Sequence, residues 1–259
     1  MKPFLFSVVI PALNEENYLP YCLQSIKSQS HRSPVNIIIS DNGSTDNTLA
    51  IAKKYGCQIV TGSIKANIAS ARQLGCQKAK ELAKKYPQYE EIIVNTDADT
   101  CLDSHFFSAL KKVFSSPQIV AASGPIIINN KKFVIKKISQ SVIRFFYLTL
   151  NLELKLPWLI KKSSGNYYLY GANACLRRSF YEKIGGWDTR FPKLEDLALV
   201  LKILKNNYHI SYHPHLATTT SVRKFANFKG FPSLKKIYDY YFKNPDFKAG
   251  YQLIKKIYQ

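Results

Sequence analysis

Asp97 and Asp99 have the residue types and the spacing that most clearly permit chemistry in this sequence. They directly follow the apolar run Glu91–Thr96, which has the length and composition of a buried strand. Carboxylates at positions i and i+2 after such a strand would project into the crevice where open α/β sheets bind ligands. Their oxygen atoms suit a divalent cation that bridges the protein and a diphosphate.

Asp41 stands in a similar position after a second apolar run, Ile37–Ser40. A carboxylate at this strand end can accept a hydrogen bond from the N3–H of a pyrimidine or from a ribose hydroxyl. Gly43 permits a tight turn, and a turn followed by a helix N-cap accounts for Gly43, Ser44 and Asp46. It does not account for Asp41, which we therefore take as a candidate ligand-binding residue.

The first half of the chain alternates strand patterns with helix patterns, which is typical of a parallel, doubly wound sheet. Helices are expected after Asn14, from Thr45, over 68–85 and after Asp103. Strands are expected over 6–10, 35–40, 57–61, 91–96 and 119–123. The alternation ends at Pro125, and the stretch from there to Tyr167 is basic and aromatic, so the second half should be organised differently.

Motifs and composition exclude several classes of protein. There is no G-x-G-x-x-G after the first strand and no G-x-x-x-x-G-K-[ST], so the usual dinucleotide fold and the P-loop hydrolases are not expected. The 5 Cys form no C-x-x-C pair and are odd in number, which favours small apolar packing residues in a reducing compartment. No apolar run reaches the roughly 18 residues of a transmembrane helix.

The net charge of +20 is concentrated in part of the sequence. Residues 130–162 and 223–259 are both rich in Lys and Arg, and both interleave these with Phe, Tyr or Trp. Such surfaces suit anionic lipid headgroups or nucleic acid, and a solvated Lys-rich face is the plainer alternative. The charge alone does not choose between these readings.

Four blocks of sequence resemble a family 2 glycosyltransferase with the GT-A fold. The first three are SVVIPALNEE at 7–16, SDNGSTDNT at 40–48 and DAD at 97–99. The fourth combines GANACLRR at 171–178, GGWD at 185–188 and LEDL at 194–197. The order and spacing of these blocks are more specific than any single motif, and the similarity covers roughly residues 6–212.

The resemblance implies a fold class and a division of the chain. The expected fold is α/β, with a Rossmann-like, mostly parallel central sheet flanked by helices and a helical, basic C-terminal extension. Residues 1–222 would form the glycosyltransferase domain, with a nucleotide-sugar-binding half at 1–124 and an acceptor half at 125–222. Residues 223–259 would form the basic, aromatic extension.

The resemblance also assigns roles on the donor side. Pro11, Leu13 and Glu15 would lie on the loop that cradles the nucleotide base, and Asp41 would contact the base. Arg72 would lie on the base and diphosphate side, and Asp97 would contact the ribose or the donor sugar.

For the reaction itself, the resemblance implies a metal ligand and a general base. Asp99 would hold Mn²⁺ or Mg²⁺. Asp196 would be the general base that takes the proton of the acceptor hydroxyl, although an acid in the first turn of a helix can also merely complement the helix dipole. Some members of the fold use a late His as a further metal or diphosphate ligand. His213 is the candidate here, with an ordinary polar role in the His213–His215 loop as the open alternative.

Two departures from the family pattern affect the expected reaction. Ala198 stands where many members have a second acid, which bears on how the acceptor hydroxyl is positioned. The Q-x-x-R-W signature of polymerising members is absent, with residues 221–225 in a comparable place. The absence argues for addition of one sugar.

We therefore expect an inverting, metal-dependent glycosyltransferase that moves one sugar from a nucleotide sugar, with a UDP-sugar favoured, to an acceptor hydroxyl. The acceptor would be a saccharide or a lipid-linked molecule in the synthesis of a cell-surface polysaccharide or a glycolipid. The expected location is cytoplasmic and peripheral on the inner membrane face, with an anionic membrane surface as partner and nucleic acid not expected. The alternative is a catalytically silent relative that serves as a binding module for anionic lipid or nucleic acid.

Overall fold

A computed structural model describes residues 2–29, 34–63, 66–130, 133–135, 169–221 and 245–258. Its centre is a 7-stranded sheet with the order β10-β6-β9-β4-β1-β2-β3. The strands are β1 (Phe4–Ala12), β2 (Val35–Asp41), β3 (Gln58–Thr61), β4 (Glu90–Asn95), β6 (Ala121–Ser123), β9 (Ala174–Arg177) and β10 (Ile210–Tyr212). Every pair is parallel except the pairs that β9 makes with β4 and β6. The expected α/β fold with a mostly parallel sheet is confirmed.

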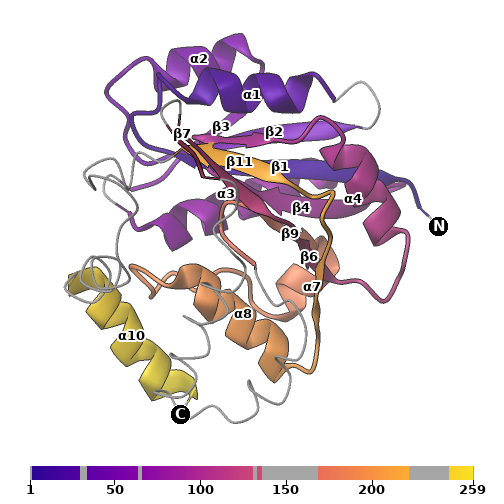
Figure 1. The fold of residues 1–259 in the computed structure, drawn as a ribbon, viewed down its shortest axis with the longest axis vertical. Coiled ribbons are helices and arrows are strands. Elements are labelled where there is room, and N and C mark those ends of the chain that lie inside the picture. The colour runs from indigo at the N-terminus through magenta and orange to yellow at the C-terminus, as the bar shows by residue number, and fades with distance from the viewer. Residues whose placement is uncertain are drawn as a thin grey trace.

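Helices cover both faces of this sheet, which explains why its central strands are apolar throughout. Val8 and Ile10 face one core cluster and Val9 faces the other, as the two-residue period of a strand requires. Helices α1 (Leu19–Lys27), α2 (Thr48–Lys54) and α4 (Phe106–Phe114) pack on the first face. The opposite face carries α3 (Ile68–Ala83), α7 (Arg178–Lys183), α8 (Glu195–Lys205) and α10 (Pro245–Tyr258). Figure 1 shows the two layers on either side of the strands.

Some element bounds differ from those expected. The helix expected soon after Asn14 begins at Leu19, with Pro20 in its first turn, where the missing N–H of proline does no harm. The strand expected from Ile119 begins at Ala121. Strand β1 extends beyond the expected 6–10 in both directions, because β2 and β4 pair with it along both of its edges.

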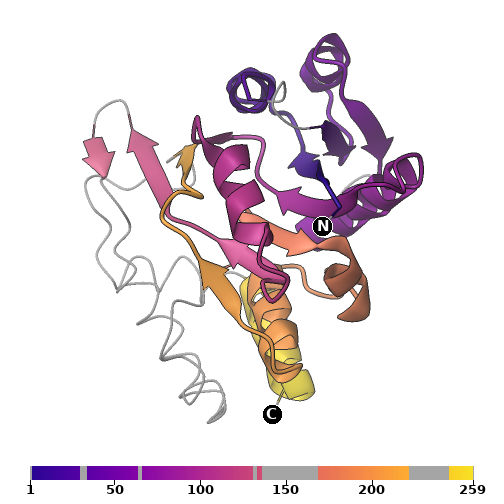
Figure 2. The same cartoon turned by 90° about the vertical axis from the view of Figure 1, so that its right-hand side faces the viewer.

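A second, 4-stranded sheet has the order β5-β11-β7-β8 and was not anticipated from the sequence. Its strands are β5 (Thr100–Leu102), β7 (Ile126–Asn130), β8 (Phe133–Ile135) and β11 (Thr218–Ser221). Thr220 pairs with Thr100 in the antiparallel ladder of β11 and β5. Residues from late in the chain are thereby brought to the carboxyl end of β4, and Figure 2 shows β7 and β8 extending away from the central sheet.

The two expected halves of the glycosyltransferase domain share one sheet. Strand β9, from the acceptor half, lies between β4 and β6 of the nucleotide-binding half. The last helix of the C-terminal extension packs on the core. This helix, α10, lies beside α8, and its residue Ile254 is fully buried. Both views show these two helices side by side (Figures 1 and 2).

The predicted basic surface falls mostly outside the described residues. Of the stretch 130–162, the structure describes only residues 130 and 133–135, and of the stretch 223–259 it describes 245–258. Within the parts of the chain that the structure describes, no helix has the length and apolarity needed to cross a bilayer.

Candidate active site

The centre of the site is an ion pair between Asp97, just beyond β4, and Arg72 of α3. Asp97 Oδ1 lies 2.6 Å from Arg72 Nη2, and the exposed fractions of the two side chains are 17% and 2%. A guanidinium this deeply buried requires a carboxylate partner, because an unpaired charge in the interior is strongly destabilising. A Cβ on Gly171 would lie only 2.3 Å from Arg72 Nη2, so a glycine there lets the backbone lie against the guanidinium.

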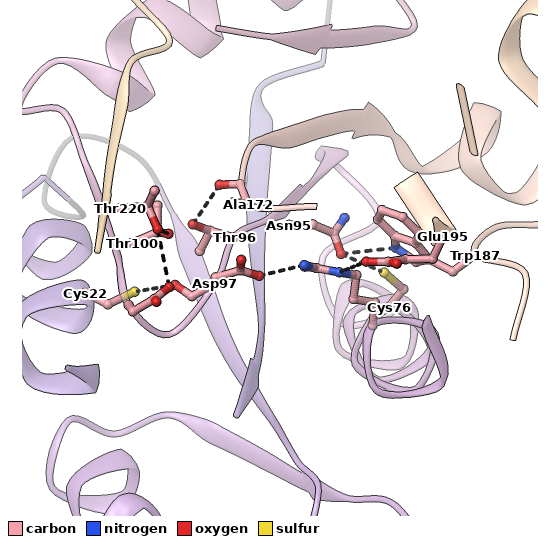
Figure 3. A network of polar contacts seen from close by, with 12 residues as sticks. Cys22, Cys76, Asn95, Thr96, Asp97, Thr100, Ala172, Trp187, Glu195 and Thr220 are labelled. Atoms are coloured by element: carbon pink, nitrogen blue, oxygen red, sulfur yellow. Dashed lines mark hydrogen bonds and ion pairs between the residues drawn. The ribbon is translucent and has the colours of Figure 1, made fainter. Parts of the chain in front are cut away.

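Arg72 also reaches the second half of the chain, at Glu195 and Trp187. Its Nε lies 4.0 Å from Glu195 Oε1 at the start of α8, and its guanidinium carbon lies 5.3 Å from the centre of the Trp187 ring. Figure 3 shows Asp97 and Glu195 pointing toward each other from these two parts of the fold. Among the described residues, Arg72 Nη1 has no hydrogen-bond partner. One buried side chain therefore joins the end of β4 to the start of α8.

A second set of contacts holds Trp187 beside this pair. The indole Nε1 donates to Asn95 Oδ1 at 3.2 Å, and Cys76 Sγ donates to the same oxygen at 3.7 Å (Figure 3). Gln73 Oε1 accepts from the Trp187 backbone N–H at 3.1 Å and from the Tyr181 hydroxyl. The loop that carries Trp187 is thus held by residues of α3 and β4.

Asp99 is buried and is held by hydroxyl groups of β11. Its Oδ2 accepts from Ser221 Oγ at 2.8 Å, and its Oδ1 accepts a longer hydrogen bond of 3.4 Å from Thr220 Oγ1. Thr100 Oγ1 in turn donates to Thr220 Oγ1 at 2.9 Å. The predicted metal ligand is thus a carboxylate fixed by two hydroxyl groups, and carboxylate oxygens suit Mg²⁺ or Mn²⁺.

Asp196, the predicted general base, lies in the first turn of α8. The pKa of its carboxyl is raised to about 7, first by burial and next by the neighbouring Glu195 carboxylate, while the Leu197 N–H and Arg72 act to lower it. Asp196 Oδ1 accepts from that Leu197 N–H at 2.8 Å, so the side chain also stabilises the N-terminal turn of α8. A carboxyl that titrates near neutral pH is suited to taking up a proton at physiological pH.

Asp41 is used by the turn that follows β2. Its carboxylate accepts from the backbone N–H of Gly43 at 2.9 Å and from that of Ser44 at 3.2 Å, and the residue is only 1% exposed. Turn formation thus accounts for Asp41 as well as for Gly43 and Ser44. The predicted contact of Asp41 with a base stays a prediction.

The loop after β1 is bound to the turn after β2 by several hydrogen bonds. Asn14 Oδ1 accepts from Thr45 N at 2.8 Å, and the Glu15 N–H donates to Thr48 Oγ1 at 2.7 Å. Asp46 Oδ2 accepts from Glu16 N at 3.0 Å. Two loops at the carboxyl ends of adjacent parallel strands are thereby fixed as one cradle.

The other predicted residues of this loop differ in exposure. Glu15 is buried, Pro11 is partly buried at the end of β1, and Leu13 projects with 49% of its surface exposed. An exposed leucine on a fixed loop can offer an apolar face to a nucleotide base. The assignment of these three residues to base binding remains a prediction.

His213 lies apart from this group. It follows β10 at the edge of the sheet, three strands away from β4 in the order of the sheet. Its ring Nε2 lies 3.3 Å from Ser211 Oγ, and burial, followed by the nearby His215, lowers its pKa. Within the described ranges, no group of three or more His, Cys, Asp or Glu residues could hold a metal ion. The metal-binding role of His213 stays a prediction.

Sequence reasoning did not assign roles to Asn95, Thr220 or Ser221. Asn95 ends an apolar strand, and a buried amide at such a position is a signal that could have been used. No comparable signal exists for Thr220 and Ser221, because their contact with Asp99 depends on the pairing of β11 with β5.

Solved structures of other proteins share this fold. The crystal structure of GalNAc-T7 with UDP, GalNAc and Mn²⁺ matches with a TM-score of 0.66 and 15% identity, over 97% of this chain and 48% of that one. S. aureus TarS 1-349 in complex with UDP-GlcNAc matches with a TM-score of 0.60 and 18% identity, over 93% and 64% of the two chains. The mannosyltransferase PcManGT from Pyrobaculum calidifontis, in complex with GDP-Man and Mn²⁺, has a TM-score of 0.58 and 18% identity, over 100% and 71%.

Relatives in sequence include a probable glycosyltransferase, YdaM, of Bacillus subtilis, which is 25% identical over 82% of this chain and 49% of its own length. An N-acetylglucosaminyltransferase of Azorhizobium caulinodans is 25% identical over 48% of this chain and 31% of its own length. The chain thus spans less than half the length of these two relatives. The family model described as "Glycosyl transferase family 2" matches residues 7–185, well over half of the chain. On this match, together with the shared fold, the chain belongs to glycosyl transferase family 2.

Proposed function

We propose that this protein transfers a single sugar, with inversion, from a nucleotide sugar to an acceptor hydroxyl. The observation that carries the proposal is the buried contact of Arg72 with Asp97 on one side and Glu195 on the other. Asp97, which we assign to donor binding, is linked through Arg72 to the helix turn that holds Asp196, and this supports the proposal. A donor bound at Asp97 and an acceptor bound at Asp196 would therefore lie next to each other.

Donor binding is assigned to the cradle and to the Arg72 pair. Leu13 would pack against the base, with Pro11 and Glu15 shaping the loop, and the turn of Asp41 would lie at its edge. Asp97, held in place by Arg72, would accept hydrogen bonds from the ribose or the donor sugar. Arg72 Nη1, which has no hydrogen-bond partner among the described residues, would donate to the bound donor. A UDP-sugar is favoured because the structures of TarS and GalNAc-T7 were determined with UDP or UDP-GlcNAc.

The residues around Asp99 fit a divalent cation of the Mg²⁺ or Mn²⁺ type. Such ions are commonly held by one or two carboxylates together with the phosphates of the substrate, so a cluster of three protein ligands is not required. Asp99 would hold the ion, with Ser221 and Thr220 fixing its carboxylate. The bound ion would neutralise the charge of the departing nucleoside diphosphate.

Asp196 would act as the general base. Its raised pKa lets it accept the proton of the acceptor hydroxyl as the oxygen attacks the anomeric carbon. The reaction then needs one base and no covalent intermediate, and a single displacement inverts the anomeric configuration. The acceptor is proposed to be a saccharide or a lipid-linked molecule of cell-surface synthesis, reached from the cytoplasmic side of the membrane.

The proposal can be tested with a thermal-shift screen of nucleotide sugars, each with and without Mn²⁺. We expect stabilisation by a UDP-sugar that Mn²⁺ enhances. Asp99→Ala should remove the enhancement and keep a weaker, metal-independent response. Asp103→Ala, on the neighbouring loop, should keep the parent's Mn²⁺-enhanced shift. Equal nucleotide affinity of the parent with Mn²⁺ and with EDTA would exclude the role given to Asp99.

A further inference from the structure

The turn before α8 has a backbone conformation that its own residues do not explain. Leu194, the N-cap residue, has φ of 66°, in the left-handed region that leucine rarely adopts. It makes no side-chain cap hydrogen bond. A bulky residue remains in this conformation only where surrounding contacts hold it there. The next two residues are Glu195 and Asp196, so these contacts also determine where the proposed base lies.

Helix α10 supplies such contacts from the C-terminal end of the chain. Gly250 lies in the middle of this helix, where glycine costs about 1 kcal/mol relative to alanine. A Cβ at Gly250 would lie 2.4 Å from the Lys193 carbonyl oxygen and 3.8 Å from Leu194 Cβ. The missing side chain lets α10 lie directly against the turn that precedes Glu195.

Two further contacts join α10 to α8 itself. Ile254 is fully buried in the same core cluster as Leu197 and Leu201. The Tyr258 hydroxyl donates to the Ala198 carbonyl oxygen at 3.3 Å, two residues beyond Asp196. The burial of Tyr258, with the nearby Asp188 carboxylate, raises its pKa to about 12, so the hydroxyl keeps its proton at neutral pH.

We propose that α10 is a positioning element for the catalytic base, with Gly250 and Tyr258 holding the turn and first helical residues that carry Asp196. The inference rests on the proposed function of Asp196 and extends it to a segment outside the matched family region, which ends at residue 185. The largest charge effects on the pKa of the Asp196 carboxyl come from Glu195 of its own helix, which raises it, and from Arg72 of α3, which lowers it. The contacts of α10 with this region are the close approach of Gly250 to the Lys193 carbonyl and the hydrogen bond from the Tyr258 hydroxyl.

The first variant is Gly250→Ala, which adds one methyl group against the Lys193 carbonyl. A displaced turn should lower kcat by about 10- to 100-fold and leave the KM for the nucleotide sugar unchanged, because a misplacement of about 1 Å is enough for such a loss. The matched control is Ala249→Gly on the exposed side of α10, which weakens the helix without approaching Lys193. The control should keep the parent kcat.

A readout independent of turnover is the titration of the Asp196 carboxyl by ¹³C NMR, assigned with Asp196→Asn. Because burial raises its pKa, a displaced and better hydrated turn should lower that pKa by about one unit in Gly250→Ala. A purely structural role of α10 would change the melting temperature and leave this titration alone.

Tyr258→Phe tests the positioning role of α10 if Gly250→Ala does not fold. This change removes only the hydroxyl that donates to Ala198 and keeps the packed ring. We expect a kcat lower by about two- to tenfold and a pKa shift in the same direction. Parent values for both quantities would overturn the proposal. A shifted titration in a protein that transfers no sugar would instead contradict the proposed function and leave the positioning role intact.

Discussion

The loops that we propose bind the donor and the turn that we propose carries the base are held in opposite ways. On the donor side, the loop after β1 and the turn after β2 bind each other through side-chain oxygens and backbone N–H groups, as in Asn14 with Thr45 and Asp46 with Glu16. On the acceptor side, the turn at Leu194 has no side-chain cap and lies against Gly250 of a helix remote in sequence.

This difference separates two steps of the proposed reaction. The donor cradle depends on contacts between neighbouring strands, so it should keep its shape when the C-terminal helix is changed. The position of Asp196 depends on packing between distant parts of the chain. Changes in α10 should therefore affect the chemical step, and changes in the cradle should affect donor binding. The predictions below test this separation.

The largest effect is expected for Asp196→Asn, which removes the proposed base and preserves its shape. The loss of a general base lowers the rate by about 10²- to 10⁴-fold. Donor affinity, measured by calorimetry with the nucleotide sugar, should equal that of the parent. Glu182→Gln, in an ion pair on α7 outside the site, should show neither change. Lost donor affinity with unchanged turnover at saturation would show that Asp196 belongs to the donor side.

The difference between local contacts and contacts of distant segments also determines what could be predicted from the sequence. Strands β1, β2 and β4 are continuous apolar runs, so local patterns were sufficient to predict them. The helices were predicted in the right order, but those expected after Asn14, from Thr45 and after Asp103 begin later, at Leu19, Thr48 and Phe106. The placement of Asp97 and Asp99 beyond β4 followed from that strand alone. The family resemblance added Arg72 and Asp196, which no local pattern would have joined.

Contacts between distant segments could not be predicted in this way. Strand β9 lies between β4 and β6 because its buried residues complete the sheet, and nothing local to Ala174–Arg177 indicates this neighbour. The hydrogen bonds from Ser221 to Asp99 depend likewise on the second sheet. The hydrogen bonds that Asp41 accepts from the N–H groups of its own turn were likewise not predicted, and its contact with a base stays a prediction.

The next largest effect should come from Arg72→Met, which breaks the link between the two sides. Removing one partner of a buried ion pair lowers the free energy of unfolding by about 3–5 kcal/mol, because the other charge stays buried without compensation. Urea denaturation would measure this. Lys80→Met, on the same helix, breaks a more exposed pair with Glu182 and should cost less than about 1 kcal/mol. Equal losses in the two variants would show that Arg72 is not a structural link.

The pH dependence of transfer should report the environment of Asp196. A general base must be deprotonated, so kcat should fall about tenfold per unit as the pH drops below the pKa of about 7. Because the Glu195 carboxylate raises this pKa, Glu195→Gln should move the acid limb of the profile to lower pH. Rate measurements at saturating donor would show this. A profile that is flat from about pH 5 to about pH 8 would contradict the assignment.

The smallest effect is expected for Asp46→Ala in the donor cradle. Asp46 accepts from the N–H of Thr48 at 2.9 Å and from that of Glu16 at 3.0 Å, so its removal takes away one hydrogen bond within the turn and one between the two loops. Loss of such a capping side chain lowers the free energy of unfolding by about 1 kcal/mol. The KM for the donor should rise, and kcat should stay at the parent value.

Asp103→Ala is the matched control for this last change. Asp103 Oδ1 accepts from the His105 N–H at 3.1 Å, a similar local contact before α4 that joins no second loop. Its loss should lower stability by a similar amount and leave the donor KM unchanged. If Asp46→Ala instead lowered kcat, the cradle would also act on the chemical step. The two sides of the site would then not be separable in the way that their contacts indicate.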